Sequence, residues 1–139
     1  MQLLGLYPVI VTVHLRECRD FHCCWFGYDV GFEADWFVWL SRSDGPPFAL
    51  AFMHPEHPSS PPSPAAYRGD GMFLTVQVAD ARAEYERLRA GGLGFALELT
   101  DEPWGQRRFG VVDPAGMWVD VVEQTEPAAG WWDPYMATT

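Results

Sequence analysis

Residues 102–120 read Glu-Pro-Trp-Gly-Gln-Arg-Arg-Phe-Gly-Val-Val-Asp-Pro-Ala-Gly-Met-Trp-Val-Asp. Two runs in this region, Arg107–Val112 and Trp118–Val122, are rich in β-branched and aromatic residues, which favours strands. The turn Pro103-Trp104-Gly105 precedes the first run, and Asp113-Pro-Ala-Gly116 separates the two. The stretch therefore predicts two neighbouring strands that follow a turn led by a tryptophan.

The residues upstream of this stretch predict a strand, a helix and a further strand. Met72–Val78 and Phe95–Leu99 are apolar and extended in character. Between them, Ala81–Ala90 has helical spacing, with Ala81, Tyr85 and Leu88 on one face. Asp80 is a good N-cap residue, and Gly91-Gly92 is typical of a helix end. Residues 71–125 thus predict the order βαβββ.

The same order appears in the first part of the chain. Tyr7–Val13 predicts a strand, and Leu15–Phe26 predicts a helix that ends at Gly27. We expect its buried face to carry Leu15, Cys18, Phe21 and either Cys24 or Trp25. Three extended stretches follow, with a Ser-Asp-Gly-Pro-Pro turn at residues 43–47 between the last two. The expected stretches are Tyr28–Phe32, Asp35–Arg42 and Phe48–His54.

This internal repeat predicts one α+β domain over residues 1–125. Its half-repeats are residues 5–54 and 71–125, joined by the Pro- and Ser-rich link 55–70. Neither half can bury a sheet face alone. We expect the tandem βαβββ repeats, paired within the chain or between two chains, to form a concave mixed sheet with the helices on its outer face. Residues 126–139 form an aromatic C-terminal tail.

Composition limits the classes of partner. The 139 residues contain 19 acidic and 9 basic side chains, a formal net charge of −10, which disfavours nucleic acid and anionic membranes and favours cationic ligands. No apolar stretch is long enough to span a membrane, and the N-terminus does not resemble a signal peptide. We therefore expect a cytoplasmic protein. Its three cysteines, Cys18, Cys23 and Cys24, are expected to be reduced and packed rather than bound to metal.

Two segments carry a resemblance to a known family. Leu15–Gly27 resembles the first-helix signature of the glyoxalase, bleomycin resistance and dioxygenase superfamily, with the fold called vicinal oxygen chelate, although His22 replaces the usual Tyr and His14 the usual Asp. The run 102–120 resembles the Pro-Trp-Gly and Asp-Pro-x-Gly segment of its bleomycin-binding members. The resemblance spans residues 5–125 and implies the paired-repeat fold.

The resemblance also implies where metal ligands would lie. Metal-using members hold a divalent ion with four His, Gln or Glu side chains from the first and fourth strands of each half. The matching positions here are Tyr7, Ala51, Phe73 and Asp120. Three of these cannot serve as ordinary ligands, so we expect no metal and no cofactor. The pair His54 and His57 enters a Pro-rich loop without further ligands, and we do not expect it to bind metal.

In place of a metal, we expect an aromatic binding groove. Because strand side chains alternate, residues that share parity with the four positions face the groove. Trp39 fits this face better than Trp36, and the resemblance implies that Trp104 stacks on a flat ligand, with Asp120 as the only acid. The expected ligand-binding residues are Tyr7, Trp39, Ala51, Met53, Phe73, Thr75, Trp104, Trp118 and Asp120.

These residues favour a non-catalytic protein that sequesters a flat aromatic molecule, such as an antibiotic, with a possible positive charge. The resemblance implies a homodimer with the site at the subunit interface. Two alternatives stay open. One is a metal-dependent glyoxalase or dioxygenase of the same fold, and the other is a regulatory module whose groove is filled by its own tail.

Overall fold

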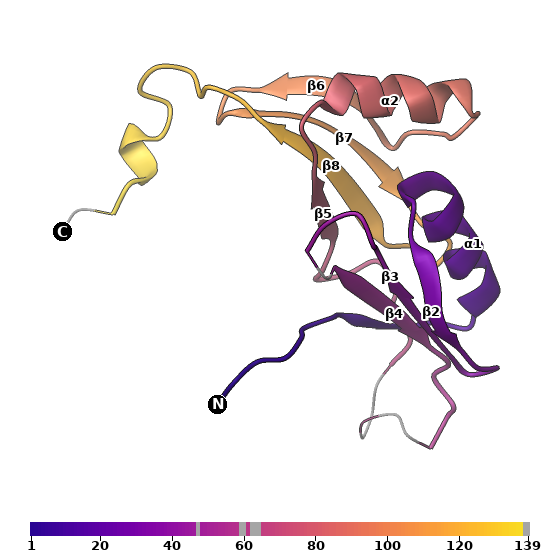
Figure 1. The fold of residues 1–139 in the computed structure, drawn as a ribbon. Coiled ribbons are helices and arrows are strands. Elements are labelled where there is room, and N and C mark those ends of the chain that lie inside the picture. The colour runs from indigo at the N-terminus through magenta and orange to yellow at the C-terminus, as the bar shows by residue number, and fades with distance from the viewer. Residues whose placement is uncertain (47, 59–60, 62–64, 138–139) are drawn as a thin grey trace. The chain divides into compact units, whose positions relative to one another are not determined.

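The first βαβββ run is present in the computed structural model, which describes residues 1–46, 48–58, 61 and 65–137. Its elements form a sheet of order β1-β4-β3-β2, in which β1 pairs with β4 in parallel and the other pairs are antiparallel. Helix α1 lies along one face of this sheet (Figure 1). The elements are β1 (Val9–Val11), α1 (Leu15–Phe26), β2 (Asp29–Glu33), β3 (Phe37–Ser41) and β4 (Ala49–Met53).

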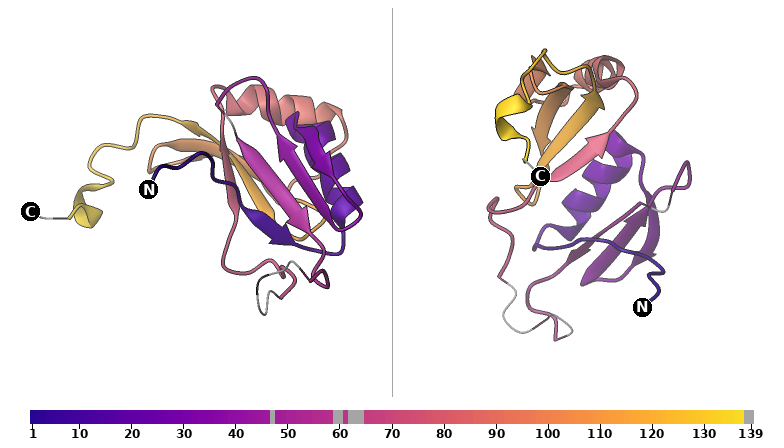
Figure 2. Two further views of the ribbon diagram at one scale, coloured as in Figure 1. Left: turned by 60° about the horizontal axis from the view of Figure 1, so that its bottom comes forward. Right: turned by 90° about the vertical axis from the view of Figure 1, so that its left-hand side faces the viewer.

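The second run repeats this arrangement. Its sheet has the order β5-β8-β7-β6, again with one parallel pair, β5 with β8. Helix α2 packs on β6, β7 and β8, as the views in Figure 2 also show. The elements are β5 (Leu74–Gln77), α2 (Ala81–Ala90), β6 (Leu97–Glu102), β7 (Gln106–Val112) and β8 (Trp118–Gln124). The predicted α+β fold with two βαβββ repeats is therefore confirmed.

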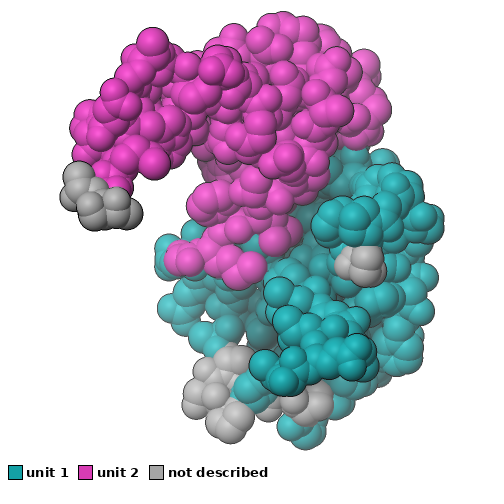
Figure 3. Space-filling model, turned by 60° about the vertical axis from the view of Figure 1, so that its left-hand side comes forward, with its two compact units in different colours: residues 1–70, 113–117 teal, residues 71–112, 118–139 magenta. Residues whose placement is uncertain are grey.

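The chain divides into two compact units, which Figure 3 colours separately. Unit 1 comprises residues 1–70 and 113–117, and unit 2 comprises residues 71–112 and 118–139. The loop 113–117 thus belongs to unit 1, although the strands on either side of it belong to unit 2. A short 3-10 helix, η1 (Asp133–Tyr135), lies in the C-terminal segment of unit 2.

Helix α1 begins and ends where its sequence predicts, but its buried face differs from the prediction. Leu15 and Cys18 are buried as expected. The helix then buries His22 and Phe26, whereas Phe21 is half-buried and Cys24 is exposed. The prediction that Phe21 and either Cys24 or Trp25 complete the buried face was therefore wrong, since Trp25 is also only half-buried. The prediction that Cys24 is packed was wrong too. A polar His can replace Phe21 in the core because Asp113 supplies a hydrogen-bond partner, as described below.

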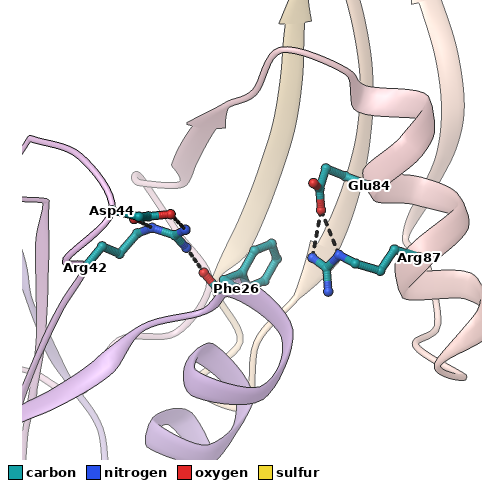
Figure 4. Close-up of polar contacts among 5 residues, drawn as sticks. All are labelled: Phe26, Arg42, Asp44, Glu84 and Arg87. Atoms are coloured by element: carbon teal, nitrogen blue, oxygen red, sulfur yellow. Dashed lines mark hydrogen bonds and ion pairs between the residues drawn. The ribbon is translucent and has the colours of Figure 1, made fainter.

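The C-terminus of α1 is fixed from two sides. Gly27 has a left-handed backbone with φ 69°, and its N–H donates to the His22 carbonyl. Arg42, just beyond β3, donates from Nη1 to the carbonyl of Phe26 and from Nε to Asp44 at 2.9 Å (Figure 4). An arginine here satisfies a helix-end carbonyl and complements the negative end of the helix dipole.

Helix α2 confirms its predicted caps and face. Asp80 Oδ1 accepts from the Ala83 N–H at 3.0 Å, and the Gly91 N–H donates to the Arg87 carbonyl at 3.1 Å. The predicted residues Ala81, Tyr85 and Leu88 are its buried ones. On the exposed side, Arg87 pairs with Glu84 at 2.8 Å, three residues earlier (Figure 4).

Several strands differ in length from the prediction. Strand β1 covers only Val9–Val11, so Tyr7 lies before it, and β5 begins at Leu74, so Phe73 lies before it. Strand β6 runs from Leu97 to Glu102 rather than over residues 95–99, because it pairs with β7 as far as the turn. Part of the predicted turn at 43–47 and of the link 55–70 lies outside the described residues.

Candidate functional site

Strand pairing decides which side chains of unit 2 share the sheet face that α2 leaves uncovered. On the covered face, Phe109 packs its ring 5.6 Å from that of Tyr85. On the other face, β8 places Asp120 beside Thr75 of β5 and Gly110 of β7. By alternation, Trp118 shares this uncovered face with Asp120.

The carboxylate of Asp120 is already paired. Its Oδ1 accepts from Trp118 Nε1 at 2.9 Å, and its Oδ2 lies 3.2 Å from Nη1 of Arg108. Glu102 Oε2 is 3.7 Å from Nη2 of the same guanidinium. The expectation that Asp120 is the only acid of the site is wrong, because Glu102 also lies near Arg108. Arg108 lies diagonally across the β7–β8 pair from Asp120 and forms ion pairs with both carboxylates.

Arg108 also connects Asp120 to Trp104. Its guanidinium carbon lies 5.2 Å from the ring centroid of Trp104, within cation–π range. The Trp104 Nε1 donates to Gln106 at 2.9 Å, which fixes the indole at the start of β7. Trp118, Asp120, Arg108 and Trp104 thus form one continuous row of contacts, called the unit 2 strip below. Its charged members lie only partly open to solvent.

The indole of Trp118 lies against β7 at a position, Gly110, that has no side chain. A Cβ added at Gly110 would lie 2.2 Å from Cζ2 of Trp118, far inside van der Waals contact. Glycine at this position therefore lets the indole lie over β7 and reach Asp120. The other two predicted residues of unit 2, Thr75 and Phe73, are exposed, and Phe73 retains 58% of its accessible surface.

The remaining predicted residues lie together in unit 1. Trp39 of β3 pairs with Ala51 of β4, and Met53 follows on the same face. The ring of Tyr7 meets that of Trp39 edge-on at 6.3 Å. Trp39 lies over Gly31, where a Cβ would come within 2.5 Å of the indole. Ala51 and Met53 are buried, so they line this face without offering open surface.

The four positions that correspond to metal ligands do not fit a metal ion. Tyr7, Ala51 and Phe73 supply no carboxylate or imidazole, and Asp120 is occupied by Arg108 and Trp118. Among residues 1–46, 48–58, 61 and 65–137, no three His, Cys, Asp or Glu side chains gather in a group that could hold a metal. His57, which together with His54 was not expected to bind metal, stacks on Trp36 with the two ring centroids 3.6 Å apart.

A buried polar pair in unit 1 was not predicted. His22 Nε2 lies 3.0 Å from Oδ2 of Asp113, and Asp113 Oδ1 accepts from the N–H groups of Ala115 and Met117, each at 2.9 Å. The ring of His22 packs against those of Phe26 and Phe52, as that of a structural core residue does. The Asp-Pro-Ala-Gly sequence signalled a turn but gave no sign of its partner.

Arg108 was also missed as a member of the unit 2 strip. Arg108 stands between Arg107 and Phe109, and which of the two arginines faces Asp120 depends on the register between β7 and β8. In the described part of the chain, its Nε is a buried side-chain nitrogen without a hydrogen-bond partner.

No described helix is long and apolar enough to cross a membrane.

Solved structures with a similar fold include proteins of several kinds. A glyoxalase/bleomycin resistance protein/dioxygenase from Nocardioides is 22% identical, with a TM-score of 0.72 over 91% of this chain and 86% of that one. Lactoylglutathione lyase from Agrobacterium tumefaciens is 17% identical, with a TM-score of 0.69 over 88% and 95%. TnmS3, an antibiotic binding protein from Streptomyces sp. CB03234, is 18% identical, with a TM-score of 0.65 over 90% and 99%.

Comparison with curated proteins gives no match. The family model described as Glyoxalase/Bleomycin resistance protein/Dioxygenase superfamily matches residues 6–121, which include the first βαβββ run, the second run except the end of β8, the unit 2 strip and the Asp113–Met117 loop. The chain therefore belongs to the glyoxalase/bleomycin resistance protein/dioxygenase superfamily.

Proposed function

We propose that this protein binds and sequesters a flat aromatic small molecule, of the kind found among antibiotics, without a metal ion and without converting it. The observation that carries the proposal is the unit 2 strip, in which Trp104 and Trp118 flank the charged pair of Arg108 and Asp120. Indole rings supply stacking area for a flat molecule, while the charged pair orients its polar groups.

The charges of the strip favour a neutral or singly cationic ligand. Arg108 and Asp120 of the strip cancel, and Glu102, which lies beside the strip at Arg108, adds one negative charge, so the three together carry a formal charge of −1. The whole chain carries −10 and adds to this attraction for cations. A dianionic ligand would meet repulsion from both the strip and the protein surface.

The proposal includes a homodimer as the binding form and the cytoplasm as its location. TnmS3, whose fold this chain resembles, is an antibiotic binding protein, which is compatible with sequestration. The same fold also serves lactoylglutathione lyase, so fold alone does not separate binding from catalysis. The misfit of Tyr7, Ala51, Phe73 and Asp120 to a metal supports binding.

The test is a tryptophan-fluorescence titration against a panel of flat compounds that includes proflavine, phenazine and quinoline derivatives. At least one compound is expected to bind in the micromolar range and to be recovered unchanged. Trp104→Ala should weaken its binding roughly tenfold, since it removes one stacking surface. Trp25→Ala, a substitution of a helix α1 residue, is the matched control for loss of one indole and should leave the affinity unchanged.

Two results would contradict the proposal. One is the absence of binding by every compound of the panel. The other is co-purification of about one equivalent of a divalent metal, with glyoxalase or dioxygenase turnover that disappears when the metal is chelated and returns when it is restored.

A further inference from the structure

The segment after β8 is attached by its backbone to the turn between β6 and β7. The Thr125 N–H donates to the Gly105 carbonyl at 2.8 Å, and the Ala128 N–H donates to the Pro103 carbonyl at 2.9 Å. Gly105 has φ 106°, and a Cβ there would lie 2.9 Å from the Thr125 carbonyl oxygen. The turn thus has both the backbone conformation and the space to hold this segment against it.

Side chains of the segment continue the attachment onto Trp104. Trp132 Nε1 donates to the Trp104 carbonyl at 2.8 Å, and the ring of Trp131 lies 5.8 Å from that of Trp104. Tyr135 packs on Trp131 at 5.1 Å. Trp131, Trp132 and Tyr135 are called the aromatic tail below. The aromatic tail is therefore in direct contact with the end of the unit 2 strip.

The aromatic tail keeps much of its apolar surface in solvent. Trp132 is 43% exposed and Tyr135 is 67% exposed. Exposed aromatic surface held by several specific contacts, rather than left to fold over the nearest core, is typical of a binding region. A stable protein interface needs about 20–30 residues on each side, far more than these three rings supply. A small molecule fits the size of this surface better.

We propose that the aromatic tail is part of the ligand site and that Trp131 is a specificity-determining residue, whose indole contacts the same flat molecule as Trp104. The inference rests on the proposed function and extends it. Arg108 already lies over the Trp104 ring, so Trp104 cannot offer all of its surface to a ligand. Trp131 is the neighbouring ring that adds stacking area in continuity with it.

The experiment measures proflavine, a flat tricyclic cation, by fluorescence anisotropy with the full-length protein. Trp131→Ala is compared with Trp104→Ala, with the double variant and with the control Trp25→Ala. Trp131→Ala is expected to weaken proflavine binding roughly tenfold. The double variant should lose less than the product of the two single losses, because both rings contact one ligand. Circular dichroism and the thermal midpoint establish that each variant is folded.

The outcomes separate this inference from the proposed function. Loss of affinity in Trp104→Ala with unchanged affinity in Trp131→Ala overturns the role of the aromatic tail and leaves the proposed function standing. If the wild-type protein binds neither proflavine nor any other compound of the panel, both the inference and the proposed function are overturned. Full affinity in both single variants removes both rings from the site and overturns the inference. Sedimentation velocity is measured in parallel. A dimer that dissociates in Trp131→Ala while each protomer keeps its proflavine affinity would make the tail a contact between copies and overturn the inference.

Discussion

Nε2 of His22 lies 3.0 Å from Oδ2 of Asp113, although the two residues are 91 positions apart in the chain. Both side chains are almost closed to solvent, with 2% and 0% of their side-chain surface exposed. The contact joins helix α1 to the loop 113–117 within unit 1. It provides the buried imidazole with a partner and fixes the loop through the Ala115 and Met117 N–H groups.

Substitution of Asp113 is therefore expected to destabilise the fold in a graded way. Asp113→Ala removes the acceptor of three hydrogen bonds and should lower the free energy of unfolding by about 3–5 kcal/mol. Asp113→Asn keeps a carbonyl oxygen for the Ala115 and Met117 N–H groups and an amide group that can still form a hydrogen bond with the His22 ring, so a loss of about 1 kcal/mol is expected. Urea unfolding followed by circular dichroism measures both. Equal losses in the two variants would contradict this account of the pair.

A methyl group at Gly110 is expected to displace Trp118 from the unit 2 strip. The added Cβ of Gly110→Ala would lie 2.2 Å from the Trp118 indole, so the ring must move and its bond to Asp120 must lengthen or break. We expect a loss of about 1–3 kcal/mol in the free energy of unfolding and a changed near-ultraviolet circular dichroism spectrum. Gly94→Ala is the control, because a Cβ at Gly94 meets no atom within 4 Å. Identical spectra for the two variants would mean that Trp118 does not lie over Gly110.

The cysteines of α1 are expected to differ sharply in reactivity. Burial raises the pKa of the Cys18 thiol to about 12, and the nearby charge of Asp113 acts in the same direction. A raised pKa means that almost no thiolate forms at about pH 8, so Cys18 should resist iodoacetamide in the native protein. Cys24 is exposed and should react. Peptide mass spectrometry after timed labelling measures both, and denatured protein, in which both react, is the control. Rapid native labelling of Cys18 would show that it is not buried.

Sequence reasoning located the helices more accurately than the strands. Helices α1 and α2 have the predicted limits because local signals such as Asp80 and Gly27 define their ends. Strand limits depend on the partner strand, which no local pattern identifies. Strand β6 therefore extends to Glu102, where its pairing with β7 ends, and β1 shortens to three residues.

Which side chains of the candidate site share a sheet face could be predicted from the sequence, but which of them are in contact could not. Alternation placed Thr75, Trp118 and Asp120 on one face, which agrees with their register in the structure. It could not show that Arg108 reaches Asp120, because that diagonal contact depends on the register between β7 and β8. The contact between the tail and Trp104 depends on tertiary structure.

Substitution of Arg108 tests whether the unit 2 strip selects its ligand by charge. Arg108→Met keeps much of the stem volume but removes the cation that pairs with Asp120 and Glu102. Affinity for proflavine should then rise roughly tenfold, because two carboxylates no longer have an internal counter-ion. Affinity for acridine, which has the same three-ring shape and is uncharged at about pH 8, should not rise. Both affinities are measured by fluorescence titration in the same buffer.

The same variant should also be less stable, since a buried Asp120 loses its cation. We expect a loss of about 3 kcal/mol in the free energy of unfolding. Arg108→Lys, which keeps the charge but not the planar group over Trp104, controls for this loss and should retain the wild-type preference between the two dyes. If Arg108→Met raises the affinities for proflavine and acridine equally, the effect is steric and the charge of the strip does not select the ligand. If the substitution lowers the affinity for proflavine alone, Arg108 itself binds the ligand. The assignment of Asp120 and Glu102 as the groups that attract the cation is then wrong.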